Sequence, residues 1–313
     1  MRNLGKLAVL GITALGLALA GPQDNSLVIG ASQEPRVLAG DFLRVISNQA
    51  IKSEIEQYLF APFIGFNADS QNFPVLATEV PTLENGRLRV TDIGGGKKRL
   101  EMDITIRPDA KWSDGRPITT EDVAFYFEVG KAKGMPVLNP DFWERVNVRI
   151  KDARNFTLIF EPAYYYDTYG PINTYAPKHI MGPEWERVKA AARGLDPDKD
   201  AEKLNELYRN FFLKFATPQA LNRGAMVYSG PFKLKRWVPG NSIEMERNPN
   251  FPIKPEGGES KYVQKVVYRF IQNTNSLLVA VIGGSIDATS SVSLTFDQGR
   301  SPQLVRRAPG RFD

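Results

Sequence analysis

Apolar and polar positions change period several times along the chain. Residues 99–106 alternate between apolar side chains and charged or hydroxyl side chains, which predicts a half-buried strand. Residues 51–60 and 200–215 have apolar side chains at helical spacing and predict helices. The broad stripe on the second of these consists of Leu204, Leu207, Phe211, Phe212 and Phe215. A membrane-surface helix is one interpretation of that stripe, but the mixed acids and bases on its other side are more typical of a helix facing a core.

Other strand-like and helical runs fill most of the remaining chain. Strands are predicted at 27–31, 87–92, 266–271 and 286–289, and another begins at Asn155. Helices are predicted after Thr119, from Pro183 to Gly194, and over 276–282 with Asn273 or Asn275 as the N-cap. Because strands and helices alternate without an internal repeat, the fold class is expected to be α/β (mixed α+β).

A basic hairpin is predicted in "YSGPFKLKRWVPGNSIEMERNPNF", which runs from Tyr228 to Phe251. Its two strand-like runs are broken at Pro239-Gly240 and are followed by an Asn-Pro-Asn turn. Glycine and proline at these points fix tight turns, so the hairpin should be rigid.

The stretch before the helix at Thr119 contains several polar and aromatic residues that are candidates for a functional site. Thr119 is a good N-cap, and Asp122 completes a capping box with it. Trp112 is expected to be a core anchor, and Asp114, in Ser-Asp-Gly, to form a turn and not to act as a catalytic acid.

Composition excludes several classes of function. The net charge is +5, and the lysines and arginines are interspersed with 35 acidic residues and form no dense basic block. No nucleic acid is therefore expected as a partner. The chain has no cysteine, which excludes disulfides and thiolate metal sites, and its only histidine, His179, is expected to be structural. A secreted hydrolase is disfavoured, since no Gly-x-Ser-x-Gly elbow is present. We therefore expect no enzyme activity, no cofactor and no metal.

The N-terminus resembles a cleavable leader. Arg2 and Lys6 precede an uncharged run over 7–20, and small side chains at Ala18 and Ala20 suit a signal peptidase. A helix of fourteen residues is short for spanning a bilayer core of about 30 Å. Cleavage after residue 20 and export are therefore predicted, with a retained membrane anchor as the alternative.

Four motifs appear in a characteristic order: "LATEVPTLENGRL", "IRPDAKWSDGRPITTEDVAFYFE", the hairpin above, and "VVYRFIQNTNSLLVAVIGGSIDAT". With the exported strand before them, they make residues 26–289 similar to the extracellular solute-binding proteins of ABC importers in the family that binds peptides, nickel and oligosaccharides. The resemblance implies a two-lobed periplasmic-binding-protein fold that closes on a ligand.

The resemblance also implies how the chain is divided. Residues 1–20 would be the signal peptide and 21–258 the first lobe, with an inserted subdomain at about 54–158. Residues 259–313 would be an incomplete start of the second lobe, reached through a connection rich in proline and glycine. The strands at 266–271 and 286–289 are then expected to pair in a sheet whose other members are missing from this chain. Many relatives have a lipid-modified cysteine at the cleavage site, where this chain has Gly21.

Candidate ligand-binding residues follow from the same resemblance. The loop after the first strand, Ser32 with Gln33, Glu34 and Pro35, should face the cleft, as should Tyr228, Ser229 and Gly230. A tyrosine-rich segment is either a cleft wall or a packing cluster: Tyr164, Tyr165, Tyr166, Tyr169 and Tyr175.

The expected function is that of an exported receptor, periplasmic or at the cell surface. It would deliver a small solute, with a peptide as the best single choice, to the membrane permease of an ABC importer, and would be a monomer when complete. The alternative is a truncated remnant of such a receptor without transport activity.

Overall fold

The computed structural model describes residues 25–67, 69–164, 167, 176–254 and 262–299. The predicted leader and the connection at 255–261 lie outside the described residues. The strands are β1 (Ser26–Ala31), β2 (Ile64–Phe66), β3 (Asn72–Pro74), β4 (Leu88–Gly94), β5 (Lys97–Thr105), β6 (Val146–Ile150), β7 (Asn155–Phe160), β8 (Phe232–Val238), β9 (Ser242–Arg247), β10 (Lys265–Phe270) and β11 (Ala288–Thr289). The helices are α1 (Ala50–Leu59), α2 (Thr120–Gly130), α3 (Pro140–Arg145), α4 (Lys178–Ala192), α5 (Ala201–Ala216), α6 (Pro218–Asn222), α7 (Thr274–Ile282) and α8 (Phe296–Gly299).

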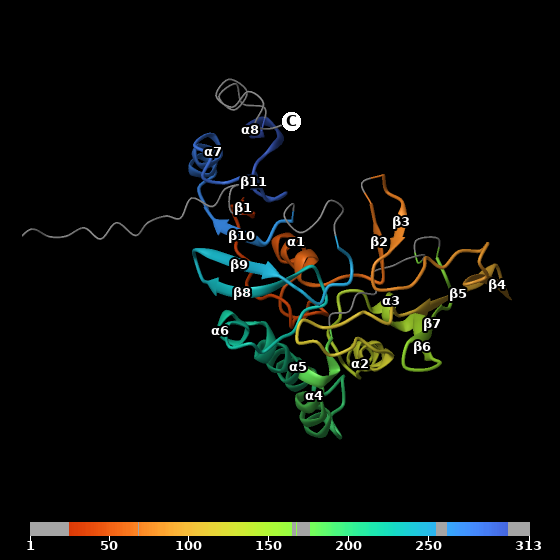
Figure 1. Cartoon of the computed structure of the whole chain (residues 1–313). Helices are drawn as coiled ribbons and strands as arrows, with labels where there is room; N and C mark the ends of the chain where they lie inside the picture. Colours follow the sequence, from red (N-terminus) through yellow and green to blue (C-terminus); the bar gives the residue numbers. More distant parts are fainter. Residues whose placement is uncertain (1–24, 68, 165–166, 168–175, 255–261, 300–313) are drawn as a thin grey trace, which may run out of the picture.

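The main sheet brings together both ends of the described chain. Its strand order is β11-β1-β10-β9-β8, with β1 parallel to β10 on one side and to β11 on the other (Figure 1). The expectation that the strands at 266–271 and 286–289 pair with each other in a separate sheet is therefore wrong. β1 lies between them. The helix α7 connects β10 to β11 as the crossover of a β-α-β unit, and such a crossover allows a third strand between the two that it joins.

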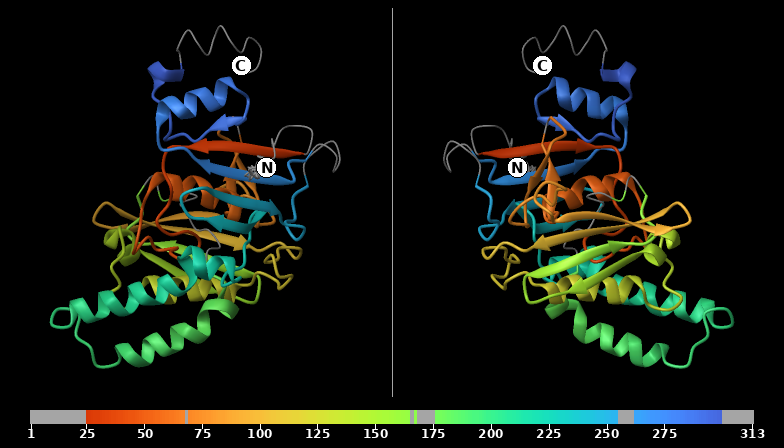
Figure 2. Two further views of the ribbon diagram at one scale, coloured as in Figure 1. Left: turned by 90° about the vertical axis from the view of Figure 1, so that its left-hand side faces the viewer. Right: turned by 90° about the vertical axis from the view of Figure 1, so that its right-hand side faces the viewer.

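Each face of β1 is covered by a hydrophobic core, a small one on one face and the main one on the other. Leu277 and Val281 of α7 pack on Val28, Val267 and Ile286 and are buried there. On the opposite face, Ile29 and Ala31 join the larger core that also contains the apolar side of α1. Figure 2 shows α7 lying over the red strand β1, with the short helix α8 beside it. Leu278 and Ile282 of α7 are partly exposed.

A second sheet has the antiparallel order β4-β5-β7-β6. Its strand β5 confirms the predicted alternation, since Leu100, Met102 and Ile104 are buried while the residues between them are partly exposed. The predicted hairpin is confirmed as β8 and β9, with Gly240 at a φ of 73° in the turn, a conformation that favours glycine.

Helices α2, α4 and α5 form a layer below the sheets in Figure 1. The capping box of Thr119 and Asp122 is confirmed at the start of α2, and Asn273 is the N-cap of α7. The prediction that Pro183 begins a helix is wrong, because α4 begins at Lys178. The amide of Lys178 is anchored on Asp122 Oδ1 at 2.9 Å. Gly182 precedes the proline and has no Cβ to clash with its ring, so the helix continues through Pro183.

Candidate functional site

The carboxyl ends of three parallel strands meet at one edge of the main sheet. β1 ends at Ala31, β10 at Phe270 and β11 at Thr289. After β1 the chain leads to α1 on one face of the sheet, whereas after β10 it leads to α7 on the other face. Ligands of open α/β sheets bind at such points, where the connections diverge beyond the carboxyl ends of adjacent strands. This edge is therefore the candidate site.

The loops that leave β1 and β11 are joined to each other at this edge. The amide of Ser32 donates to Ser293 Oγ at 3.0 Å, and the Ser32 hydroxyl donates to the carbonyl of Val292 at 3.4 Å. The amide of Ser290 continues the ladder by donating to the carbonyl of Gly30 at 2.8 Å. We call residues 290–293 the serine turn. Ser290 and Ser293 are buried by these contacts, whereas Ser291 is exposed at this end of the sheet.

A carboxylate from α1 is hydrogen-bonded to the serine turn. Glu54 accepts hydrogen bonds from the hydroxyls of Tyr268, Ser290 and Ser291 at 2.8, 2.9 and 2.6 Å. Burial raises the pKa of Tyr268, and the neighbouring Tyr58 and Glu54 raise it further, so the phenol stays protonated and donates.

The loop after β1 is at the predicted place, but its side chains differ in accessibility. Gln33 is exposed, whereas Pro35 is buried. Glu34 is held by the β8–β9 hairpin: its carboxylate accepts from the Trp237 indole N–H at 2.7 Å and from the Gly240 amide at 2.8 Å. Of the three predicted contacts, Gln33 alone has an exposed side chain.

The second predicted group lies within the protein. Tyr228 and Ser229 are buried, and the Ser229 hydroxyl accepts from the Ala61 amide at 3.1 Å. Gly230 passes so close to the end of α1 that a Cβ would lie 2.6 Å from the backbone of Leu59. The structure thus shows these residues packing on α1, and their contact with a ligand stays a prediction.

The tyrosine-rich segment falls largely outside the described residues, which include only Tyr164 of its tyrosines. The Tyr164 ring is 40% exposed and lies under the guanidinium of Arg145, 3.9 Å from the ring centroid. Arg145 is buried and is held by Asp167 at 2.8 Å. This tyrosine packs on one side and is open to solvent on the other.

His179 and Asp114 form an ordinary structural pair. His179 Nε2 lies 2.9 Å from Asp114 Oδ2, and the imidazole packs edge-on against the indole of Trp112, which is fully buried. Asp114 also accepts the amide of Arg116 at 3.1 Å, as expected of a turn former. Within the described ranges, no cluster of three or more His, Cys, Asp or Glu side chains could hold a metal ion.

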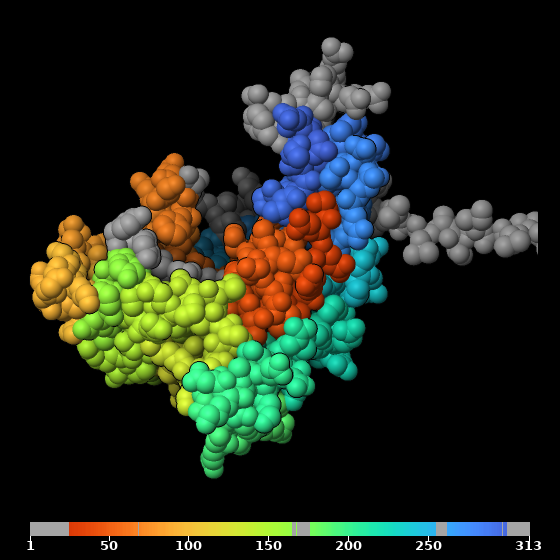
Figure 3. Space-filling view, turned by 180° about the vertical axis from the view of Figure 1, so that it is seen from behind, coloured from red at the N-terminus to blue at the C-terminus, as the bar shows by residue number. Residues whose placement is uncertain are grey.

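Figure 3 shows the molecule from the side on which β1 ends. The red segment around β1 touches the blue segment that contains the serine turn, and the surface is hollowed between this block and the orange β2–β3 hairpin. The candidate site therefore lies at the edge of a concave surface.

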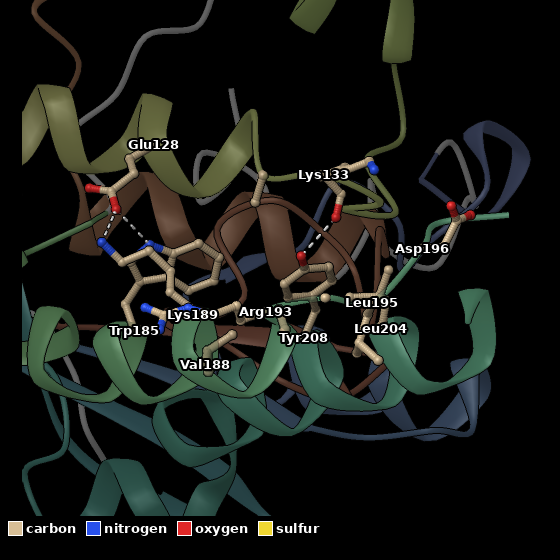
Figure 4. Close-up of a pocket in the computed structure, with 13 residues that line it drawn as sticks. Glu128, Lys133, Trp185, Val188, Lys189, Arg193, Leu195, Asp196, Leu204 and Tyr208 are labelled. Carbon is tan, nitrogen blue, oxygen red and sulfur yellow. Dashed lines mark hydrogen bonds and ion pairs between the residues drawn. The ribbon is translucent and has the colours of Figure 1, made fainter. Parts of the chain in front are cut away.

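A separate cavity of about 610 Å³ lies at the opposite end of the molecule, among α2, α4 and α5 (Figure 4). Its polar groups bond to each other: Glu128 accepts from the Trp185 indole at 3.1 Å and from Lys189 at 2.6 Å, and the Tyr208 hydroxyl donates to the carbonyl of Lys133 at 2.8 Å. These contacts join the helices, so we assign the cavity no part in the candidate site.

The sequence reasoning missed the serine turn and Glu54. Three serines directly after a predicted strand could have indicated the turn, because polar side chains at a carboxyl strand end are typical of a site. Glu54 gave no signal, since a glutamate on an amphipathic helix has the appearance of a solvated residue.

Parallel strand ends that form a polar edge are typical of open α/β sheets that bind a ligand. Residues 97–303 match the family described as bacterial extracellular solute-binding proteins, family 5 Middle. That match spans more than half of the chain, so the chain belongs to this family.

Similar sequences are longer than this chain. The oligopeptide-binding protein AppA of Bacillus subtilis is 24% identical over 270 residues, which cover 85% of this chain and 40% of AppA. The peptidoglycan-binding protein YepA of Agrobacterium fabrum is 30% identical over 199 residues, which cover 61% of this chain and 26% of YepA. The chain thus spans less than half the length of these relatives.

Solved structures agree on the fold. AppA from Bacillus subtilis in complex with a nonapeptide has a TM-score of 0.58 at 21% identity, covering 83% of this chain and 43% of AppA. NikZ from Campylobacter jejuni in complex with Ni(L-His) has a TM-score of 0.54 at 17% identity, covering 85% of this chain and 43% of NikZ. The predicted fold, part of a two-lobed periplasmic binding protein, is confirmed.

No helix in the described part of the chain has the length and apolar character needed to cross a membrane.

Proposed function

We propose that the protein is the exported solute-binding receptor of an ABC importer and that its solute is a peptide. The observation that carries the proposal is the family match over 97–303, which runs from β5 through the serine turn. This family consists of binding proteins, which supports the expectation that the chain binds and does not catalyse.

A peptide suits the candidate site better than a compact ion. The serine turn and the loop after β1 present backbone groups and the exposed side chains of Ser291 and Gln33 at a concave edge. An extended peptide presents N–H and C=O groups with which such polar groups can form hydrogen bonds. The name of AppA and its nonapeptide complex favour the same solute.

The remaining parts of the proposal follow from the class of receptor. A leader at 1–20 directs export, and a monomer closes on the solute and presents it to a membrane permease. Among the ligand-binding residues we propose, Gln33, Glu34 and Pro35 contribute through the loop after β1. Tyr228, Ser229 and Gly230 contribute by fixing the end of α1.

Native mass spectrometry tests the solute. The protein of the intact gene, purified without denaturation from the exported fraction, should contain co-purified peptides, and its intact mass should lack residues 1–20. A metal chelate or a sugar in place of peptide would contradict the proposed solute. Full-length mass in that fraction would contradict the leader, and failure to bind any solute would favour a remnant without transport activity.

A further inference from the structure

One carboxylate connects three elements at the candidate site. Glu54 Oε1 accepts from Tyr268 of β10, and Glu54 Oε2 accepts from the Ser290 hydroxyl and from both the amide and the hydroxyl of Ser291. The amide contact is 3.0 Å long. Four donors from two separate segments therefore converge on a single side chain of α1.

The packing of α1 determines where the Glu54 carboxylate lies. The neighbouring Ile51 and Ile55 are fully buried against the core, which fixes the rotation of the helix. Glu54 is half-buried on the flank of that face and reaches the edge of the sheet. Since Ile51 and Ile55 hold the backbone, the carboxylate is positioned before any solute arrives.

The serine turn depends on this contact for its geometry. The turn begins where β11 ends after only two residues, Ala288 and Thr289, so the strand ladder gives it little support. Beyond the strand it is held by the bond of Ser290 to Gly30 of β1, by that of Ser293 to the amide of Ser32 after β1, and by Glu54. A hydrogen bond to a charged acceptor is stronger than one to a neutral group.

We propose that Glu54 is a positioning residue for solute binding: it holds the serine turn, with its exposed Ser291, against the ends of β1 and β10, so that the turn is preorganised for the solute. The inference rests on the proposed function for its solute. It predicts that loss of the carboxylate weakens binding without loss of the fold, because preorganisation removes an ordering cost from the binding step.

The test compares Glu54→Gln with the wild type. A glutamine has one acceptor oxygen where the carboxylate has two, so it cannot accept from Tyr268 and from the serine turn at both positions. Glu128→Gln is the matched control, because Glu128 also accepts two side-chain donors but lies at the cavity in Figure 4, remote from the site.

Two measurements decide the outcome. Hydrogen exchange of the 288–295 segment should be about tenfold faster in Glu54→Gln and unchanged in Glu128→Gln, and exchange in β5 should be unchanged in both variants. The affinity of the protein expressed from the intact gene for a nonapeptide probe should fall about tenfold in Glu54→Gln. It should be unchanged in Glu128→Gln.

Either of two results would overturn the inference: unchanged exchange in the serine turn, or faster exchange with unchanged affinity. A wild type that binds no peptide would contradict the proposed solute. In that case exchange alone decides whether Glu54 holds the turn, so the two failures are distinguishable.

Discussion

Glu34 accepts a hydrogen bond from the indole N–H of Trp237 at 2.7 Å, across 203 residues of sequence. Its second oxygen accepts the amide of Gly240, so one side chain ties the loop after β1 to the turn of the β8–β9 hairpin. Trp237 is buried, and the one polar atom of its side chain is in this contact. The relationship gives the hairpin a role in shaping the candidate site, because it fixes the loop that follows β1.

Replacement of Glu34 should therefore destabilise the protein. Glu34→Ala leaves the buried Trp237 N–H without its partner, and we expect a loss of about 2 kcal/mol in the free energy of unfolding. Urea denaturation followed by tryptophan fluorescence measures it. Gln33→Ala, at the adjacent exposed position, should change the stability by less than about 0.5 kcal/mol. Equal effects for the two variants would show that the contact is not stabilising.

Gly230 should tolerate no side chain. An added Cβ would lie 2.6 Å from backbone atoms of Tyr58 and Leu59, which cannot rotate away. We expect Gly230→Ala to cost about 3 kcal/mol or more, through displacement of the end of α1. The control is Gly86→Ala, where φ is 70° and nothing lies within 4 Å, so only backbone strain of about 1–2 kcal/mol applies. Thermal unfolding that ranks Gly86→Ala as the more damaging change would contradict the packing argument.

Local patterns were sufficient to predict most elements, since alternation in β5 and the capping box of Thr119 depend on neighbours in sequence. Strand order could not be predicted in this way. The insertion of β1 between β10 and β11 depends on contacts between residues about 260 positions apart, such as the Asp287 carboxylate with the Val28 amide. α4 also continues through Pro183, against the usual helix preference of proline.

Long-range contacts also limit what the sequence shows of the candidate site. The sequence shows that the loop follows a strand, because a strand end is visible in it, and the contact of the loop with a solute stays a prediction. The burial of Ser229 and the bonding of Glu54 result from long-range packing, and no local pattern at either residue shows them.

Asp103 should make the stability depend on pH. Partial burial raises its pKa, but hydrogen bonds from Arg89, Lys151 and Thr157 outweigh that effect and hold the pKa well below the usual 3.8. A depressed pKa contributes stability that is fully present above pH 3.8 and is lost as the pH falls through the lower folded value. Asp103→Asn should therefore cost about 1–2 kcal/mol at pH 7 and progressively less toward pH 2.

Urea unfolding of both proteins from pH 7 to pH 2 measures this difference. The control is Asp198→Asn at an exposed loop position, for which the difference from wild type should stay near zero at every pH. A difference for Asp103→Asn that is constant over the whole range would mean that the charge of Asp103 is not what stabilises the sheet.

Lys52 and Glu56 should depend on each other, because both are buried in α1. Their side chains are 0% and 4% exposed and lie 2.9 Å apart, and Lys52 Nζ also donates to the carbonyl of Asp41 at 2.9 Å. Lys52→Met leaves the Glu56 carboxylate buried without its counter-charge, and we expect a loss of about 3–5 kcal/mol. The double variant Lys52→Met/Glu56→Gln removes both charges, so it should be more stable than Lys52→Met alone. A double-mutant cycle by urea denaturation measures the coupling, and additive losses would contradict the pairing.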